Sequence, residues 1–373
     1  MEYKHLKNIA QITMGQSPKS ETYNNKKEGL PFFQGNADFG EISPKVRIWC
    51  SVPKKVAHKN DILISVRAPI GALNIADTEC CIGRGLAAIS VRNIKDRDYI
   101  FNALKAKSEY LKNRGTGSTF KAINKNILED VEIPIVSTEK RDIEIKVLNK
   151  LNIVKKQKEK ELSKLDTLIK ARFVEMFGDI KNNKNYNYKP ISDLTNVVSG
   201  GTPKRDVKEY WDRGTIPWVK TTELKNNKVN STEEYITKTG LQNSSAKLVP
   251  SHTILIAMYG QGKTRGMTAY LEKEAATNQA CACILPSSKI NSEYLWQYLI
   301  MSYEELRNLA KGGNQPNLNS RMIKDFPILD PPIALQNKFV SFIHQVDKSK
   351  VAIQKSLDET QTLFDSLMQK YFS

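Results

Sequence analysis

Residues 254–264 read ILIAMYGQGKT, an apolar run that leads into a glycine-rich turn and then Lys-Thr. From Ala257 to Thr264 they fit the permissive nucleotide-binding pattern, in which backbone N–H groups hold phosphates and the lysine reaches the outer ones. The chemistry of such a loop would be ATP binding and hydrolysis. A P-loop also requires a helix whose N-terminus faces the phosphates, but Gly266 and an alternating stretch, Met267–Tyr270, follow instead.

Two further groups of residues have types that could do chemistry. Asp330-Pro331-Pro332-Ile333 is similar to the Asp-Pro-Pro-Tyr motif of amino-methyltransferases, but those enzymes stack an aromatic fourth residue on a flipped base. The cysteines contain no CxxC pair and the histidines have no ligand spacing, so we predict no metal site. We also expect no resident cofactor. The cysteines and histidines of the chain are Cys50, Cys80, Cys81, Cys281, Cys283, His5, His58, His252 and His344.

The chain contains one sequence pattern twice, in the same order and about 190 residues apart. The paired segments are KHLKNIAQITMGQSPK with KPISDLTNVVSGGTPK, LPFFQ with IPWVK, DILISVRAPIGAL with TILIAMYGQGKTRGM, and NKNILEDVEIP with NSRMIKDFPIL, which begin at residues 4, 189, 30, 216, 61, 253, 124 and 319. The first copy has VRAPIG where the second has YGQGKTRG. The shared role of this segment is therefore a strand, a turn and a second strand, and we interpret the P-loop pattern as a coincidence.

Two long segments have apolar residues at helical 3–4 spacing. The first predicts a helix within residues 138–179, ended by Gly178 and Asp179, and the second predicts a helix within residues 331–373. Because both stripes are narrow and their other faces are charged, we expect the two helices to pack on each other as an antiparallel coiled coil, with a pseudo-twofold relation between the copies. The alternative is that each helix packs on its own domain. The stripes are Ile143, Val147, Leu151, Val154, Leu162, Leu165, Ile169, Phe173 and Met176, and Phe339, Ile343, Val346, Ile353, Leu357, Phe364, Leu367 and Tyr371.

Before each long helix lies a globular copy, residues 1–137 and 180–330, that mixes short β-type runs with helical stretches. This predicts an α+β fold built from two duplicated domains and two long helices. The net charge is +17, which most often indicates a nucleic-acid partner. The N-terminal residues lack the apolar core of a signal peptide, and no apolar run approaches the ~20 residues that span a bilayer, so we expect no membrane contact and a cytoplasmic location.

With this layout, the whole chain resembles the DNA-specificity subunit of a Type I restriction–modification enzyme. The motifs that carry the resemblance are Gly-Gly-Thr-Pro at 200–203, Ile-Pro-Trp at 216–218, Gln-Pro-Asn-Leu-Asn at 315–319 and Pro-Pro-Ile-Ala-Leu-Gln at 331–336. The first copy departs from them with Gly-Gln-Ser-Pro at 15–18, Gly-Thr-Gly-Ser-Thr-Phe at 115–120 and a helix start, residues 136–140, that lacks Pro-Pro.

The resemblance implies a subunit without catalysis of its own. Each target recognition domain would read one half of a gapped, two-part site in double-stranded DNA, and the helices would set the gap. The helices would also bind two methyltransferase subunits and, indirectly, a restriction or translocase subunit. S-adenosylmethionine, ATP and Mg²⁺ would be bound only by those partners. For the spacer helices we single out Val147, Leu151, Val154, Leu165, Phe339, Ile343, Val346 and Leu357.

The base-reading residues of this family vary with the target, so candidates come from side-chain chemistry. Basic side chains suit phosphates or guanine edges, and amide, hydroxyl and aromatic side chains after strand-like runs suit bases. The first group is Lys19, Lys204, Arg205, Lys263 and Arg265. The second group is Gln34, Asn36, Lys220, Thr221, Thr222, Tyr259 and Gln261, and the late loops add Lys121, Asn314, Gln315 and Asn317. An ordinary exposed turn remains the alternative for each. The alternatives for the whole chain are a helical adaptor that does not bind DNA and a P-loop ATPase.

Overall fold

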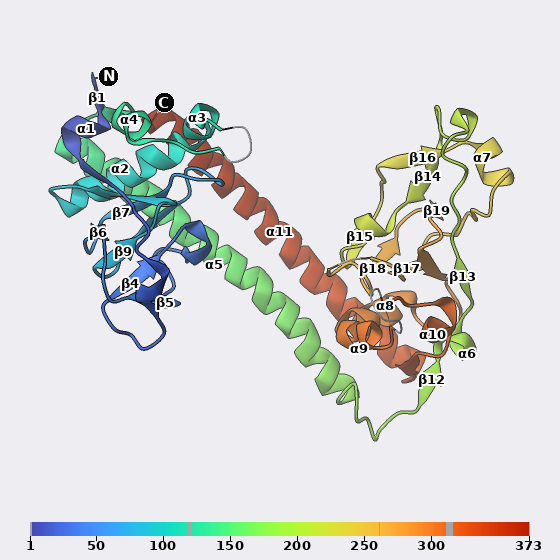
Figure 1. Cartoon of the computed structure of the whole chain (residues 1–373). Coiled ribbons are helices and arrows are strands. Elements are labelled where there is room, and N and C mark those ends of the chain that lie inside the picture. Colours follow the sequence, from blue (N-terminus) through green and yellow to red (C-terminus); the bar gives the residue numbers. More distant parts are fainter. Residues whose placement is uncertain (1, 118–120, 261, 311–315, 373) are drawn as a thin grey trace. The chain divides into compact units, whose positions relative to one another are not determined.

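The computed structural model describes residues 2–117, 121–260, 262–310 and 316–372. The chain forms two compact units, one made of Met1–Lys160 with Gln354–Ser373 and the other of Glu161–Ile353. Both units mix helices and strands, so the predicted α+β class is correct (Figure 1). The two long helices, α5 (Thr138–Phe177) and α11 (Ile333–Phe372), contribute residues to both units.

The first unit is built on two main sheets. One has the antiparallel order β2-β10-β7-β8, and the other has the order β3-β5-β4-β9-β6 with β4 and β9 parallel. The terminal strands β1 and β11 pair with each other. The strands are β1 (Glu2–His5), β2 (Gln11–Met14), β3 (Tyr23–Asn24), β4 (Leu30–Phe33), β5 (Ile48–Cys50), β6 (Val56–Ala57), β7 (Ile62–Ser65), β8 (Leu73–Ile75), β9 (Cys80–Ile82), β10 (Leu86–Ser90) and β11 (Glu132–Ile135). The short helices are α1 (Leu6–Ile9), α2 (Ile94–Ala106), α3 (Ser108–Arg114) and α4 (Lys125–Glu129).

The second unit has sheets of order β13-β20-β17-β18-β15 and β16-β14-β19, and β12 pairs with β21. Figure 1 shows α7, β14 and β16 at one end of this unit and α8, α9 and α10 at the other end, beside α11. The strands are β12 (Tyr188–Pro190), β13 (Val197–Ser199), β14 (Ile216–Val219), β15 (Asn227–Val229), β16 (Glu234–Ile236), β17 (Ile254–Ala257), β18 (Thr268–Leu271), β19 (Ala276–Thr277), β20 (Cys281–Ile284) and β21 (Pro327–Leu329). The short helices are α6 (Ile191–Leu194), α7 (Lys238–Gln242), α8 (Ser292–Met301), α9 (Tyr303–Asn308) and α10 (Ser320–Lys324).

The two units share their strand connections, which confirms the duplication predicted from the sequence. The order β2-β10-β7-β8 matches β13-β20-β17-β18, and the parallel pair β4–β9 matches β14–β19. Matching helices also begin alike. Asn93 and Asn291 cap α2 and α8, and Asn124 and Asn319 cap α4 and α10, in each case with a side chain that accepts a backbone N–H bond.

The segment with the P-loop pattern is a strand, a turn and a strand. Strand β17 is followed by turn residues at 262–266 and then by β18, which pairs with it antiparallel. A P-loop would require a helix at this point. In β20, Cys281 and Cys283 lie on the same face and are both buried.

In each unit, α5 and α11 run antiparallel. In the first unit, Lys155 donates a hydrogen bond to Gln361, and Leu148 shares a core with Phe364, Met368 and Phe372. In the second unit, the Nζ of Lys350 lies 2.7 Å from Asp166, and the ring centroids of Phe173 and Phe339 are 5.5 Å apart. Helix α5 ends where Gly178 adopts a φ of 86°, a conformation that favours glycine. The helices therefore bury part of their apolar stripes on each other.

The first unit also buries an acidic side chain in this interface. Glu144 is 3% exposed, and neither of its carboxylate oxygens has a hydrogen-bond partner among the described residues. The Nζ of Lys140, 4.0 Å away, forms only a long ion pair with it. Burial raises the pKa of the Glu144 carboxyl above its ordinary value. The same position of α11, six residues after the helix begins, is held by the buried Phe339.

Candidate nucleic-acid interface

In the first unit, five backbone hydrogen bonds bring four loops and a late segment to one edge of the sheets. They run from Gly15 N to Leu86 O (2.9 Å), Gln16 N to Ile82 O (3.0 Å), Gly83 N to Phe33 O (2.8 Å), Val66 N to Gly85 O (2.9 Å) and Ile123 N to Val66 O (2.9 Å). The loops that meet are those after β2, β4, β7 and β9, with residues 121–123 beside them. We call this region the loop edge.

The second unit forms the same loop edge with the same five bonds. They run from Gly200 N to Cys281 O (3.2 Å), Gly201 N to Thr277 O (2.9 Å), Asn278 N to Val219 O (3.1 Å), Met258 N to Ala280 O (2.8 Å) and Leu318 N to Met258 O (3.0 Å). The close packing explains the first glycine of the motif in each copy. A Cβ on Gly15 would lie 2.2 Å from the carbonyl oxygen of Gly83, and one on Gly200 would lie 2.1 Å from Thr277 Oγ1.

The loop edge of the first unit brings together Lys19, Gln34, Asn36 and Lys121. Lys19 is exposed and forms a surface ion pair with Glu21 at 3.6 Å. The side chain of Gln34 follows β4 and donates to Ser17 Oγ at 3.0 Å, so it is held within the edge. Asn36 begins a short 3-10 helix, η2 (Asn36–Asp38), and Lys121 is exposed.

In the second unit, Lys204, Arg205, Lys220, Thr221 and Thr222 lie in the loops after β13 and β14. Lys204 is exposed, and the two threonines begin the 3-10 helix η4 (Thr221–Glu223), which corresponds to η2. Arg205 stacks on the Trp211 ring, with its guanidinium carbon 3.8 Å from the ring centroid, and donates a hydrogen bond to Glu234.

Lys220 is bound to two carboxylates. Its Nζ lies 2.8 Å from Glu234 and 2.9 Å from Glu233, and these bonds, the one to Glu234 first, raise the pKa of Lys220 to about 12. Arg205, Lys220 and Glu234 thus form one charge cluster beside the loop edge. Within this cluster Arg205 and Lys220 are already paired, which the sequence did not reveal.

The late candidates of the second unit surround the β17–β18 turn. Tyr259 is 44% exposed and Lys263 is exposed. Arg265 donates to the carbonyl oxygen of Pro316, so this turn is joined to the segment that carries the half-buried Asn317. Gln261, Asn314 and Gln315 lie outside the described residues.

Several polar residues of the loop edge escaped the sequence prediction. Arg84 and Gln279 are exposed at matching turns, β9–β10 and β19–β20, and Arg67 is exposed in the turn that corresponds to Tyr259. Arg307 of α9 donates to the carbonyl oxygen of Arg265 at 3.1 Å and supports the β17–β18 turn. The duplicated frame is the signal that could have found Arg84 and Gln279, because each stands two residues before the strand, β10 or β20, that pairs with β2 or β13.

The residues singled out on the long helices divide into two groups. Phe339, Ile343 and Val346 are buried in the core of the second unit, while Val147, Leu151, Val154, Leu165 and Leu357 are half-buried. Placing Ile143 in the inward stripe was wrong, because its side chain is 62% exposed. Other apolar side chains also face solvent on these helices: Ile153, Leu168, Val174, Val351 and Leu363.

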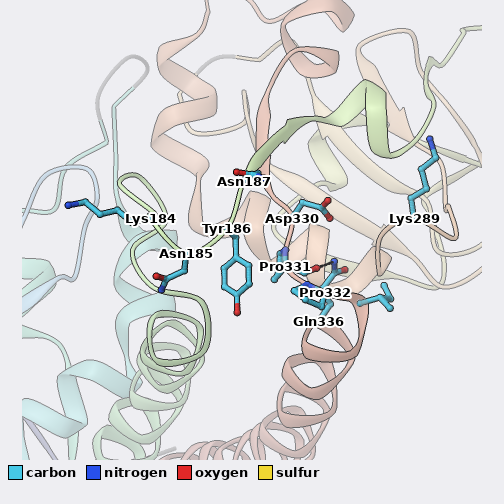
Figure 2. A pocket seen from close by; sticks show the side chains of 10 residues that line it. Lys184, Asn185, Tyr186, Asn187, Lys289, Asp330, Pro331, Pro332 and Gln336 are labelled. Atoms are coloured by element: carbon cyan, nitrogen blue, oxygen red, sulfur yellow. Dashed lines mark hydrogen bonds between the residues drawn. The ribbon is translucent and has the colours of Figure 1, made fainter.

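The Asp330–Ile333 segment lines a surface pocket of about 510 Å³ in the second unit (Figure 2). The carboxylate of Asp330 pairs with Lys189 Nζ at 2.6 Å. Gln336 is buried, and its side chain donates to Pro331 O at 2.8 Å and accepts from Asn291 N at 2.9 Å. The prolines and Gln336 therefore fix the start of α11 against α8.

Within the ranges that the structure describes, no three His, Cys, Asp or Glu side chains are grouped as a metal site would require. In the same ranges, no helix is both long and apolar enough to cross a membrane.

Comparison with known proteins gives one consistent family. The model of the Type I restriction modification DNA specificity domain matches residues 1–167 and again residues 183–360. The two matched regions correspond to the two copies found in the sequence and in the sheet topology.

Individual relatives have related names. The MjaX specificity subunit of a type I restriction enzyme from Methanocaldococcus jannaschii is 46% identical over 156 residues, which cover 40% of this chain and 36% of that protein. The MjaIX specificity subunit of the same organism is 24% identical over 402 aligned positions, covering 99% of this chain and 92% of that protein. The fold is similar to a solved S subunit of a Type I restriction–modification system from M. genitalium, with a TM-score of 0.58, 15% identity and coverage of 100% of this chain and 96% of that one.

Proposed function

This chain belongs to the family of Type I restriction–modification DNA specificity proteins, and on that basis we propose that it recognises a gapped, two-part DNA site. Each unit would read one part with its loop edge. The observation that carries the proposal is the repetition of this edge, because two copies of the same five-bond frame present different polar side chains. Matching frames with different side chains are what two different half-sites require.

The net charge of +17 supports a polyanionic partner. At the loop edges, Lys19, Lys121, Lys204 and Lys263 are exposed and suit the phosphate backbone. Arg205 and Lys220 are tied to Glu234, so we assign them a positioning role within the recognition loops. Phosphate contacts would fix the protein on the duplex, and the remaining polar side chains would read bases.

The long helices would act as the spacer between the two reading units. Each has 40 residues, which corresponds to about 60 Å of helix. Their exposed apolar side chains, including Ile143, Val174 and Val351, would bind two methyltransferase subunits and through them a restriction subunit. The division into residues 1–137, 138–179, 180–330 and 331–373 belongs to this proposal. So does a cytoplasmic, non-catalytic subunit whose partners carry S-adenosylmethionine and ATP.

A map of methylated adenines in the source cell, made with and without this gene, tests the proposal. Loss of a single gapped, two-part motif is the expected result. A parallel measurement of duplex binding by the full chain should show affinity that falls steeply with salt. An unchanged map combined with negligible duplex binding at low salt would refute the proposal and favour a helical adaptor that does not bind DNA.

A further inference from the structure

The β9–β10 and β19–β20 turns hold equivalent residues in fixed positions. Arg84 stands between Gly83 and Gly85, and both neighbours form bonds of the five-bond frame. Gln279 stands in the same way between Asn278 and Ala280. Because the main chain is held on both sides, the direction of each side chain from the loop edge is set by the fold.

The approach of the neighbouring loop limits how this turn can move. A Cβ on Gly83 would lie 2.8 Å from Gln34 Oε1, and one on Gly85 would lie 2.4 Å from the carbonyl oxygen of Gln34. Ser17 Oγ accepts a hydrogen bond from the backbone N of Arg84 at 3.3 Å as well as from Gln34. The turn that carries Arg84 is therefore packed tightly against Gln34 and Ser17.

Two pairs of equivalent positions lie at the loop edges, Gln34 with Lys220 and Arg84 with Gln279, and they differ in whether their polar groups already have partners. Gln34 follows β4, and its side chain donates a hydrogen bond to Ser17. Lys220 follows β14, and its side chain forms ion pairs with Glu233 and Glu234. Arg84 and Gln279 are exposed, and neither side chain forms a hydrogen bond or an ion pair with any residue that the structure describes. Their donors and acceptors are thus available to a ligand at the loop edge.

We propose that Arg84 and Gln279 are the specificity-determining residues at matching places in the two half-sites, and this rests on the proposed function. An arginine pairs in bidentate fashion with O6 and N7 of guanine, and a glutamine with N6 and N7 of adenine. Arg84 reads a guanine in one half-site, and Gln279 reads an adenine in the other. Gln34, whose carbonyl oxygen accepts a hydrogen bond from Gly85 N at 3.2 Å, positions the turn that carries Arg84.

The test is selection of bound duplexes from a randomised library by the full chain, followed by sequencing. The native chain should enrich a two-part motif. Arg84→Ala should reduce the preference for guanine at one position of one part by about 5-fold to 150-fold and leave the other part unchanged. Gln279→Ala should do the same for an adenine in the other part. Arg84→Lys, which keeps the charge but not the planar fork, should weaken the preference.

The control is Lys121→Ala, which removes an exposed lysine from the same edge and should weaken binding to all sequences alike. A two-part motif that is unchanged in Arg84→Ala, Arg84→Lys and Gln279→Ala would overturn this assignment and leave the proposed function standing. A native chain that enriches no motif would overturn both. Thermal melting of each variant identifies any loss of folding, and Arg84→Gln, expected to exchange guanine for adenine, gives a gain of preference that misfolding cannot produce.

Discussion

Replacing Glu144 by methionine should stabilise the first unit. A buried acceptor without a hydrogen bond costs about 1–3 kcal/mol, and a charged one costs more. Glu144 is 3% exposed, and both of its carboxylate oxygens lack such a bond among the described residues. We therefore expect Glu144→Met to raise the free energy of unfolding by about 2 kcal/mol at pH 8, which corresponds to about 4–8 °C in Tm for a unit of this size.

The pH dependence of this gain provides a second signature. The pKa of Glu144 in the folded protein lies above its ordinary value of 4.5, because burial disfavours the charged carboxylate. Between these two values the folded state binds more protons than the unfolded state, so the native protein gains stability as the pH falls. The advantage of Glu144→Met should consequently be largest at pH 8 and shrink toward pH 5.

Calorimetry at both pH values measures the effect, and hydrogen exchange of residues 138–160 assigns it to the first unit. Glu139→Met is the matched control, because Glu139 is an exposed carboxylate on the same helix and its replacement should leave Tm nearly unchanged. A Glu144→Met protein that melts lower than the native protein, or whose advantage is the same at pH 5 and pH 8, would refute the reasoning.

Three further substitutions test other contacts. Lys263→Ala should weaken binding to every duplex and reduce the salt slope by about one, as measured by fluorescence anisotropy; an unchanged slope removes this lysine from the phosphate contacts. Gln336→Ala should lower the unfolding free energy by about 2–3 kcal/mol, because it leaves the carbonyl group of the buried Pro331 and the backbone N–H of the half-buried Asn291 unpaired. The exposed Gln345→Ala is its control, and equal Tm values for the two would contradict this account. Arg205→Lys should lower Tm by the equivalent of about 1 kcal/mol through weaker stacking on Trp211; an unchanged Tm would mean that the stacking contributes nothing.

Much of the fold could be predicted because the chain contains the same sequence pattern in two copies. The strand-turn-strand at residues 254–271 and the two long helices follow from local sequence patterns. The first copy has the same strand-turn-strand pattern without Gly-Lys-Thr, and this comparison excluded the P-loop interpretation. Periodicity within one element is a short-range property, and short-range properties are what a sequence displays directly.

The parts that escaped prediction depend on contacts between distant residues. The apolar periodicity predicted that Ile143 is buried and did not predict that Glu144 is buried. Which face of the helix is buried depends on the elements that pack against it. The pairing of Arg205 and Lys220 with Glu234 likewise depends on how the loops after β13 and β14 meet β16. Side-chain chemistry identified these residues as candidates, but only the fold shows that they are already paired.

The five bonds of each loop edge join main chain to main chain, and nearly every residue type supplies the same N–H and C=O groups. Mutation is therefore restricted at few places: proline is excluded at the donors, and a side chain is excluded at Gly15, Gly85, Gly200 and Gly201. Codons such as those for Arg84 and Gln279 can change one at a time while the protein stays folded. If Arg84 and Gln279 read bases as proposed, a lineage that carries this gene can change what the protein recognises without passing through an unstable intermediate.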